Sequence, residues 1–557
     1  MNMNMSSTRL FLWMTLFMMM WFTYRAWLAD YPAVAPVAPA NQVETNGEVP
    51  PPSLPDIDPA TASETLPAVG DPTTAAPTVD APEPGRLINI RTDVLDLFID
   101  TQGGDIVRAD ISGYPVDKDN PDIPVRLLDF EPDTRWVFQT GLRDVAGGNE
   151  PNHLATYSAA NNEYVLADGS DELVVTLDWV GNGNLSAQKV YTFRRGQYAI
   201  ELDLIVDNQT GELWNGAPYA QLYRHHVPVG RSYTSVDSYS FTGPVLYDGD
   251  EYDKLDVEDL VTEPIVQSLA GGWLASIQHH FLAAVVPPPE DEVRYSAQTR
   301  GSDYQLTALG PVTGIAPGDN LTYPVKLFVG PKLQEQLAET GNELELTVDY
   351  GVLTILAQPL FWLLAWVHQY VNNWGWSIII VTFFIKLAFY KLTATSGRSM
   401  AKMRKLQPRM KALQERFKDD KQALSQHMME LYKREKVNPA AGCLPILIQM
   451  PFFFAFYWVL IESVEIRQAP FALWITDLSS RDPYFILPIL MGGAMLMQTR
   501  LNPAPPDPVQ ARVMQIMPIA FTALFAFFPA GLVLYWLTNT ALSILQQWRI
   551  NKVIGAD

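Results

Sequence analysis

One apolar run decides the fold of this chain: WSIIIVTFFIKLAFY, residues 376–390. The run is typical of a membrane helix, and Lys386 is its single charged side chain. An ionisable group inside a membrane helix is costly unless it is paired or solvated, so Lys386 suggests a functional site. The alternative is that Lys386 extends its ammonium to the headgroups, because only about 6 Å of helix separates it from Tyr390.

The composition indicates a membrane protein with a separate soluble part. Of the 557 residues, 48% are hydrophobic and 18% are charged, and the net charge is −22. The charge is unevenly distributed, since residues 391–436 contain thirteen Lys and Arg against five Asp and Glu. The acidic bulk excludes general nucleic-acid affinity, and we expect no sequence-specific binding of nucleic acids. The basic segment is a candidate site for anionic partners.

The first 85 residues predict a membrane anchor and a tether. The apolar run from Leu10 to Leu28 follows Arg9 without a convincing cleavage site after it, so we expect a transmembrane signal anchor within residues 1–30. Residues 31–85 are rich in Pro, Ala, Thr and acidic residues, a composition that cannot bury a core. We therefore expect a disordered periplasmic tether.

Residues 86–350 predict a large antiparallel β-sandwich. Apolar and polar side chains alternate in residues 173–179, 200–207 and 343–350, which is the period of half-buried strands. A short helical piece, residues 331–339, precedes the last of these segments. Repeated strands of this kind, separated by Gly, Asn and Asp turns, imply packed antiparallel sheets.

The remaining sequence predicts a polytopic α-helical membrane protein with six spans, five of them forming the core. Residues 351–373 predict an amphipathic interfacial helix rather than a span, because Gln358, Pro359 and Asn372-Asn373 interrupt it. The predicted core spans are residues 374–390, 439–461, 483–498 and a pair within 514–548. The pair is divided at Phe528-Pro529-Ala530-Gly531, since a single crossing needs only about 20 residues. The predicted connections are a periplasmic loop at 462–482, a cytoplasmic loop at 499–513 and a short cytoplasmic tail at 549–557.

The basic segment at residues 391–438 sets the predicted orientation. The positive-inside rule places it and both termini in the cytoplasm, and it places the acidic sandwich outside, which in a bacterium is the periplasm. Apolar residues recur every three or four positions from Met400 to Phe417 and from Leu424 to Leu431, which predicts a helical hairpin. Its methionine-rich face either adapts to varied apolar partners or simply holds the two helices together.

Polar side chains interrupt the predicted spans and are candidates for one wet cavity. Thr382 lies one helical turn before Lys386 and shares its face. Gln449 lies in the next span. The later spans contribute Gln498, Thr522, Tyr535, Trp536, Thr538, Asn539, Thr540 and Ser543. Ordinary hydrogen bonding between helices is the alternative explanation.

No sequence motif predicts catalysis, a cofactor or a metal site. The chain lacks a nucleotide-binding P-loop, a Gly-x-Ser-x-Gly nucleophile elbow and a His-Glu-x-x-His zinc helix. The pairs His225-His226 and His279-His280 fall on predicted strands, where neighbours point to opposite faces, so neither pair predicts a metal site. We expect a protein that is not an enzyme and that has no cofactor.

Several segments carry the pattern of a known family. They are KMRKLQP (402–408), VNP (437–439), GCLPILIQMP (442–451), RQAPFALWI (467–475), LPILMG (487–492) and FPAGLVLYW (528–536). Together with the anchor, tether and sandwich, they resemble the YidC/Oxa/Alb family of membrane protein insertases, in its Gram-negative type.

The resemblance implies a multi-pass inner-membrane protein that inserts nascent membrane proteins into the phospholipid bilayer, alone or with the Sec translocon. It implies a hydrophilic groove, open to the cytoplasm and to lipid, with one cation. The implied groove residues are Lys386, Thr382, Gln449, Gln498, Tyr535, Trp536 and Asn539. Ribosomes or signal-recognition components would be recruited by the hairpin residues Lys402, Arg404, Lys405 and Arg409.

The chain departs from the family pattern in three places. The groove cation is commonly Arg, whereas Lys386 is a compact charge without the bidentate fork of Arg. Lys391 stands where relatives often have proline. The tail after Arg549 is short, so the resemblance does not carry over a ribosome contact through a basic tail. The competing interpretation is a polytopic transporter or channel that uses Lys386 as a solute or ion site, although the spans show no internal repeat.

Overall fold

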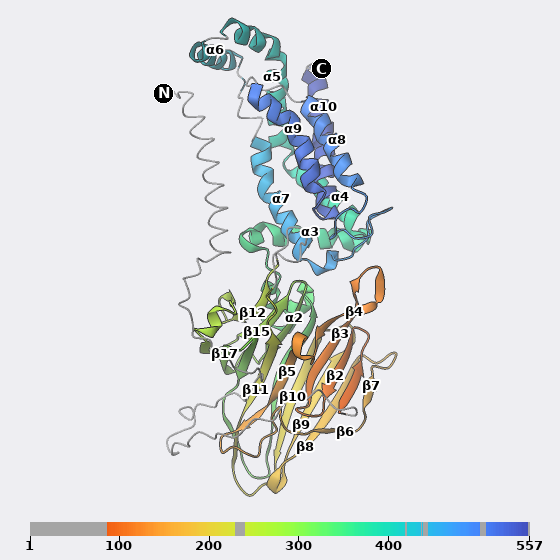
Figure 1. Ribbon diagram of the computed structural model, residues 1–557, viewed down its shortest axis with the longest axis vertical. Coiled ribbons are helices and arrows are strands. Elements are labelled where there is room, and N and C mark those ends of the chain that lie inside the picture. Colours follow the sequence, from red (N-terminus) through yellow and green to blue (C-terminus); the bar gives the residue numbers. More distant parts are fainter. Residues whose placement is uncertain are drawn as a thin grey trace, which may run out of the picture.

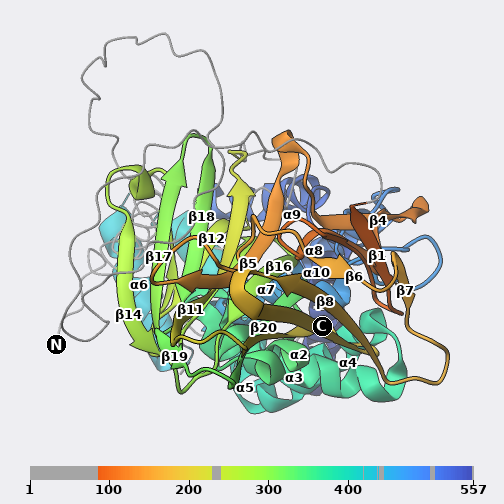
Figure 2. The same cartoon turned by 90° about the horizontal axis from the view of Figure 1, so that it is seen from below.

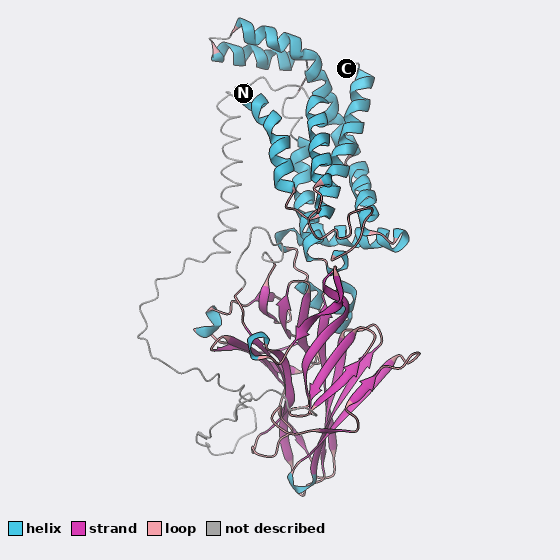
Figure 3. Cartoon of the chain, turned by 45° about the vertical axis from the view of Figure 1, so that its right-hand side comes forward, coloured by secondary structure: helices cyan, strands magenta, loops and turns pink. Residues whose placement is uncertain are grey.

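The computed structural model describes residues 86–228, 240–417, 420–435, 437, 444–501 and 508–554. The described chain has two parts, with strands at one end and helices at the other (Figure 3). This arrangement confirms the predicted fold class for the β-sandwich and for the helical part. The predicted anchor at residues 1–30 and tether at residues 31–85 lie outside the described residues.

Three sheets form the sandwich. The first contains, in spatial order, β4 (Asn120–Leu128), β3 (Asp105–Asp117), β2 (Leu95–Asp100), β1 (Leu87–Arg91) and β7 (Glu163–Val165). The second contains β13 (Tyr252–Lys254), β12 (Thr242–Tyr247), β15 (Trp273–Gln278), β16 (Phe281–Val286), β20 (Asn320–Pro331), β10 (Ala199–Asn208), β9 (Leu185–Arg194), β8 (Glu172–Val180) and β6 (Ser158–Ala159). The third contains β14 (Ile265–Ala270), β17 (Glu292–Arg300), β18 (Asp303–Leu309), β11 (Trp214–His225) and β19 (Thr313–Ile315), and β5 (Trp136–Asp144) also pairs with β11. Among the described strands β1 and β7 form the only parallel pair.

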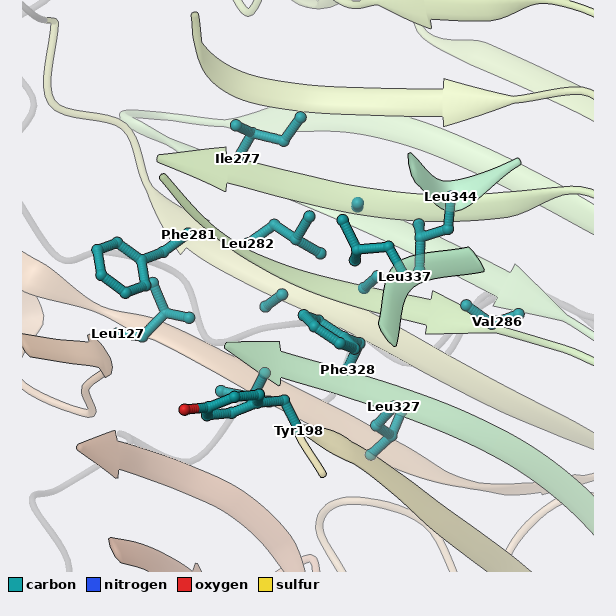
Figure 4. Packing of buried hydrophobic residues seen from close by; sticks show 14 of the residues in the cluster. Leu127, Tyr198, Ile277, Phe281, Leu282, Val286, Leu327, Phe328, Leu337 and Leu344 are labelled. Carbon is teal, nitrogen blue, oxygen red and sulfur yellow. The ribbon is translucent and has the colours of Figure 1, made fainter. Parts of the chain in front are cut away.

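Alternating side chains build the core of the sandwich, as the sequence predicts. In β10 every second residue from Ile200 to Asn208 is buried, and β8 buries Val175, Leu177 and Trp179. The helix α2 (Gln334–Thr340) adds Leu337 to a core that includes Phe328 of β20 (Figure 4). The predicted helical piece therefore exists, but it begins at Gln334 because Pro331 still belongs to β20.

The predicted strand at residues 343–350 is wrong. Residues Leu344–Thr347 form a 3-10 helix that follows Glu343, whose φ is 54°. Leu344, Thr347, Val348 and Tyr350 are buried, whereas Leu346, which the predicted strand would bury, is only half-buried. The alternation of Leu, Glu and Thr alone therefore does not distinguish a strand from this short helix, which follows a left-handed residue at Glu343.

The helical part continues from the sandwich. Its helices are α3 (Thr354–Val371), α4 (Trp374–Ala388), α5 (Tyr390–Arg416), α6 (Lys421–Arg434), α7 (Leu444–Glu462), α8 (Ile486–Leu501), α9 (Pro508–Phe525) and α10 (Ala530–Ile554). Figure 1 shows α3 lying across the sandwich-side ends of the other helices, and α5 with α6 projecting at the opposite end. The view from below shows the sheets stacked in front of the helices (Figure 2).

Length and apolar composition alone select few membrane spans among the described residues. One helical segment, Gly351–Val371, qualifies by itself, and α4 with α5 qualifies only as a pair bent by 70°. Shorter apolar stretches occur in α7, α8 and α9. The segment that qualifies contains α3, whose orientation across the other helices is the one expected of an interfacial helix. The six-span count stays a prediction.

The sandwich contacts the C-terminal end of α7 through polar side chains. The backbone oxygen of Ile461 lies 3.1 Å from His279 Nε2 and 2.8 Å from His280 Nε2. The two imidazole rings stack with their centroids 3.6 Å apart. The prediction that this pair sits on a strand and faces opposite ways is wrong. His279 has a φ of 45° and lies in the turn between β15 and β16.

The carboxylate of Glu462, next to Ile461, adds further contacts between the sandwich and α7, and we call this contact region the junction. Glu462 Oε1 accepts a hydrogen bond from Ser240 Oγ (2.7 Å), and Oε2 accepts one from Lys332 Nζ (3.4 Å). Lys332 Nζ also donates to the backbone oxygen of Thr347 at 3.1 Å. Both charged side chains are buried, so each depends on its partner in the other part of the molecule.

Glu465 makes the junction sensitive to pH. Burial raises the pKa of its carboxyl from 4.5 to about 7, and its Oε2 has no hydrogen-bond partner within the described part of the chain. The folded state therefore keeps this proton over a pH range in which the unfolded chain has lost it. We predict that stability falls by about 3 kcal/mol as the pH rises between these two pKa values. Glu465→Gln, which mimics the neutral acid, should remove this slope in thermal unfolding of the purified protein. An unchanged slope in the variant would contradict the assignment.

Candidate functional site

Lys386 points into the helical part. It lies in the last turn of α4, a helix whose first turn is capped by the Asn373 side chain accepting from the Trp376 backbone N–H at 3.1 Å. Lys386 Nζ donates a 2.7 Å hydrogen bond to Ser543 Oγ on α10. Ser543 Oγ in turn donates to the backbone oxygen of Asn539 at 2.7 Å. The half-buried Lys386 thus reaches from α4 to α10, which favours a polar site between helices over extension toward headgroups.

The structure brings together only some of the predicted groove residues. Lys386 and Asn539 lie close through Ser543, and Thr382 lies one turn before Lys386 on α4. Thr382 is buried, and its hydroxyl donates to the backbone oxygen of Ile378 in its own helix (2.6 Å). Gln449 on α7 and Gln498 on α8 are half-buried. The side chain that contacts the cation, Ser543, was only one of eight later candidates in the sequence.

Tyr535 and Trp536 belong to an aromatic cluster rather than to a polar surface. Tyr535 is buried and stacks on Phe456 of α7 with ring centroids 4.6 Å apart. Trp536 packs edge-on against Phe453 at 4.8 Å and contacts Phe525 of α9 at 5.5 Å. The ring area outweighs the single polar atom of each side chain, which explains this burial.

The aromatic cluster lies on the sandwich side of Lys386. Seven residues of α10 separate Trp536 from Ser543, which corresponds to about 10 Å along the helix. The first turn of α10 is tied to the sandwich-side loop, because the backbone N–H of Ala530 donates to the oxygen of Ser480 at 2.7 Å. Packed rings therefore separate the polar contact at Lys386 from the sandwich. The sequence does not identify the phenylalanines of the cluster, because an apolar side chain does not differ from its neighbours within an apolar span.

The hairpin of α5 and α6 buries its apolar stripe. A cluster of buried side chains joins the two helices: Leu406, Met410, Met428, Leu431, Tyr432 and Val437. Of the two interpretations of this stripe, the one in which it holds the helices together is confirmed. Among the basic residues, Lys402 and Lys405 are exposed and Arg404 is half-buried. Arg409 is exposed and pairs across the hairpin with Glu435 at 2.8 Å.

The sandwich contains a separate cleft of about 500 Å³. Its charged lining residues include Glu201 and Asp203 of β10, Lys326 of β20 and Glu339 of α2. No group of three or more His, Cys, Asp or Glu side chains placed to hold a metal ion occurs within the described ranges. The cleft is lined by residues of β10, β20 and α2, whereas Lys386 and Ser543 belong to α4 and α10. Figure 1 shows β10 and α2 in the sandwich and α4 and α10 in the helical part.

Comparison with known proteins matches both parts of the chain. The family described as YidC periplasmic domain matches residues 87–363, and the family described as 60Kd inner membrane protein matches residues 366–556. The membrane protein insertase YidC of Thioalkalivibrio sulfidiphilus is 46% identical over 563 residues, which cover 99% of each chain. The YidC insertase of Alkalilimnicola ehrlichii is 49% identical over 477 residues, 85% of this chain and 84% of that one. A crystal structure of an active YidC insertase matches with a TM-score of 0.38 at 18% identity, covering 83% of this chain and 92% of that one.

Two adjacent glycines of α8 provide a test of the packing around the site. A Cβ on Gly492 would lie 2.0 Å from Thr522 Oγ1 on α9, whereas a Cβ on Gly493 would meet no described atom within 4 Å. Thr522 cannot easily move, because its hydroxyl donates to the backbone oxygen of Pro518 (2.7 Å) and its χ1 is stiff. We predict that Gly492→Ala destabilises the helical part by about 1–3 kcal/mol. The control Gly493→Ala should be neutral or stabilising by up to about 1 kcal/mol. Thermal unfolding of the detergent-solubilised protein measures both, and equal effects would contradict the close approach of α8 and α9.

Proposed function

The chain belongs to the YidC family of membrane protein insertases, and we propose that it passes its substrates through a hydrophilic groove between α4 and α10. As a member of this family it inserts nascent membrane proteins into the inner membrane, and its sandwich is the periplasmic domain. It is not an enzyme. The relatives carry the name of insertases, so the transporter or channel alternative has no support.

The observation that carries the proposed groove is the hydrogen bond between Lys386 and Ser543. A charged side chain inside an apolar helix needs a polar environment, and this one finds it on the neighbouring helix. The half-buried side chains of Asn539, Gln449 and Gln498 supply further polar groups for the groove walls. Thr382 contributes to the same face of α4, although its hydroxyl is bonded within its own helix.

The proposed mechanism lowers the cost of moving polar segments across hydrocarbon. A polar periplasmic segment loses its hydration when it enters the bilayer, and a wet groove partway through the membrane shortens the dry path. Lys386 would hold acidic residues of the incoming chain transiently. The aromatic cluster around Trp536 would close the groove toward the periplasm, while apolar walls release the hydrophobic run to lipid.

The hairpin is the proposed recruitment surface. The side chains of Lys402 and Lys405 are exposed, and Arg404 is half-buried. Arg409 is already paired with Glu435, so we expect it to contribute less than the exposed Lys402. Ribosomes, signal-recognition components and the Sec translocon are the proposed partners. In this arrangement the hairpin and both termini lie in the cytoplasm, as the positive-inside rule requires.

Moving the charge of Lys386 tests the groove. Lys386→Arg should retain insertion, because the charge and the donor groups remain. Lys386→Ala should slow the insertion of a substrate with an acidic periplasmic tail by about tenfold, the order expected for one lost charged hydrogen bond. Lys386→Glu should be worse, because it repels the tail.

The readout is protease protection of two substrates that differ only in whether the tail is acidic or neutral. The neutral tail is the internal control, since its insertion should depend far less on the charge at Lys386. Equal insertion of both substrates by the wild type and by Lys386→Ala would reject the role of this cation.

A further inference from the structure

The helix α10 runs past the break between α4 and α5. The two helices are bent by 70° at Phe389. The residues around the break are Leu387, Ala388, Phe389, Tyr390 and Lys391, so neither Pro nor Gly explains the bend locally. The angle must therefore be set by contacts with neighbouring elements.

Contacts with α10 lie on both sides of the break. Before it, Lys386 Nζ donates to Ser543 Oγ at 2.7 Å. After it, Gln546 Nε2 donates to Thr393 Oγ1 at 2.9 Å. The Thr393 hydroxyl also lies 3.0 Å from the backbone oxygen of Phe389 and 3.1 Å from that of Tyr390. Gln546 thus contacts a hydroxyl that lies against the first turn of α5, where the oxygen of Phe389 also accepts the backbone N–H of Thr393 at 3.0 Å.

The next turn of α10 continues this contact along α5. Gln547 Nε2 donates to the backbone oxygen of Gly397 (3.4 Å) and to Asn551 Oδ1 (2.9 Å). Asn551 is buried, and Ile550 packs with Ala394 and Ala401 of α5. A Cβ on Gly397 would lie 2.7 Å from Gln547 Oε1 and 2.8 Å from Ile550 Cδ1, so the helices approach closely here.

This region was expected to be a short tail from residue 549 onward. The structure instead continues α10 to Ile554, and the residues beyond the predicted span pack against the first helix of the hairpin. The cytoplasmic location of the tail at residues 549–557 stays a prediction. The extension has a structural partner within the chain itself.

We propose that residues 543–551 of α10 form a splint that fixes the hairpin at one angle to Lys386, and that Gln546 and Gln547 are positioning residues for insertion. The role in insertion rests on the proposed groove at Lys386. A hairpin held in this way delivers each incoming segment to the cation along one path. The break itself contains no Pro or Gly that would maintain the angle without the splint, and the described ring contact there is that of Phe389 with Phe452 of α7 at 5.2 Å.

The test compares two double variants in the full-length protein, reconstituted in nanodiscs. The splint variant is Gln546→Ala with Gln547→Ala. The matched control is Leu545→Ala with Val553→Ala, two exposed side chains of the same helix. Spin labels replace the exposed residues Gln422 on α6 and Leu496 on α8, and Cys443 is changed to Ser so that labelling is specific. Pulsed electron resonance reports the distance between the hairpin and the helical part.

The wild type and the control should give one narrow distance distribution, and the splint variant should give a broad one. The splint variant should also insert substrates roughly fivefold more slowly, the order expected from losing neutral hydrogen bonds. In the Gln547→Ala, Cys443→Ser background without the spin-label cysteines, Thr393→Cys and Gln546→Cys joined by a short bismaleimide should restore the insertion rate. A merely structural defect would not be rescued by this single link.

Two outcomes would overturn the proposal. An unchanged distance distribution in the splint variant would show that α10 does not set the angle. A broadened distribution with an unchanged insertion rate would show that the angle does not matter for insertion. The distance measurement does not depend on whether Lys386 binds substrate, so failure of the splint is distinguishable from failure of the groove.

Discussion

A charged ammonium in an apolar helix must find polar partners, and this requirement at Lys386 organises the helical part of the molecule. Ser543 meets it directly, and Asn539 supports Ser543 through its backbone oxygen. These contacts bring α10 against α4. On the sandwich side, packed rings around Trp536 separate the polar contact from the sandwich, so in the proposed mechanism substrates reach Lys386 from the end that carries the hairpin. The helical part thus has a polar contact at Lys386 and an aromatic cluster between that contact and the sandwich.

The same physical rule acts at the junction with the sandwich. Lys332 and Glu462 are buried and come from different parts of the molecule, so each would be an unpaired buried charge if the parts separated. A second contact lies nearby, where Arg467 donates to the backbone oxygen of Pro115 in β3 at 2.9 Å. Together these contacts fix the lower end of α7, the helix that supplies Phe453 and Phe456 to the aromatic cluster. Contacts with the periplasmic domain therefore help to fix the position of α7 in the helical part.

The sequence predicts features that differ from their neighbours along the chain, such as a charge in an apolar run. It does not predict which side chains from distant segments contact one another. Lys386 stands out because a charge in an apolar run is rare, and the strand at residues 200–207 stands out by its period. The sequence cannot select Ser543 from the other polar residues of the late spans, because that choice depends on how α4 and α10 cross. The segment at residues 343–350 alternates like a strand, yet residues 344–347 form a 3-10 helix after the left-handed residue Glu343. Tyr535 and Trp536 were assigned to a polar surface from residue type, although their rings pack in an aromatic cluster.

The central claim is that substrates pass along the face of α10 that carries Asn539 and Ser543. The most direct measurement places a photoreactive amino acid at Asn539 or at Leu545, which is exposed on another face of the same helix. Stalled nascent membrane proteins are then irradiated in intact membranes. If substrates pass along this face, crosslinks to the nascent chain should be strong from position 539 and weak from position 545. Equal crosslinking from both positions, or a preference for position 545, would contradict this claim.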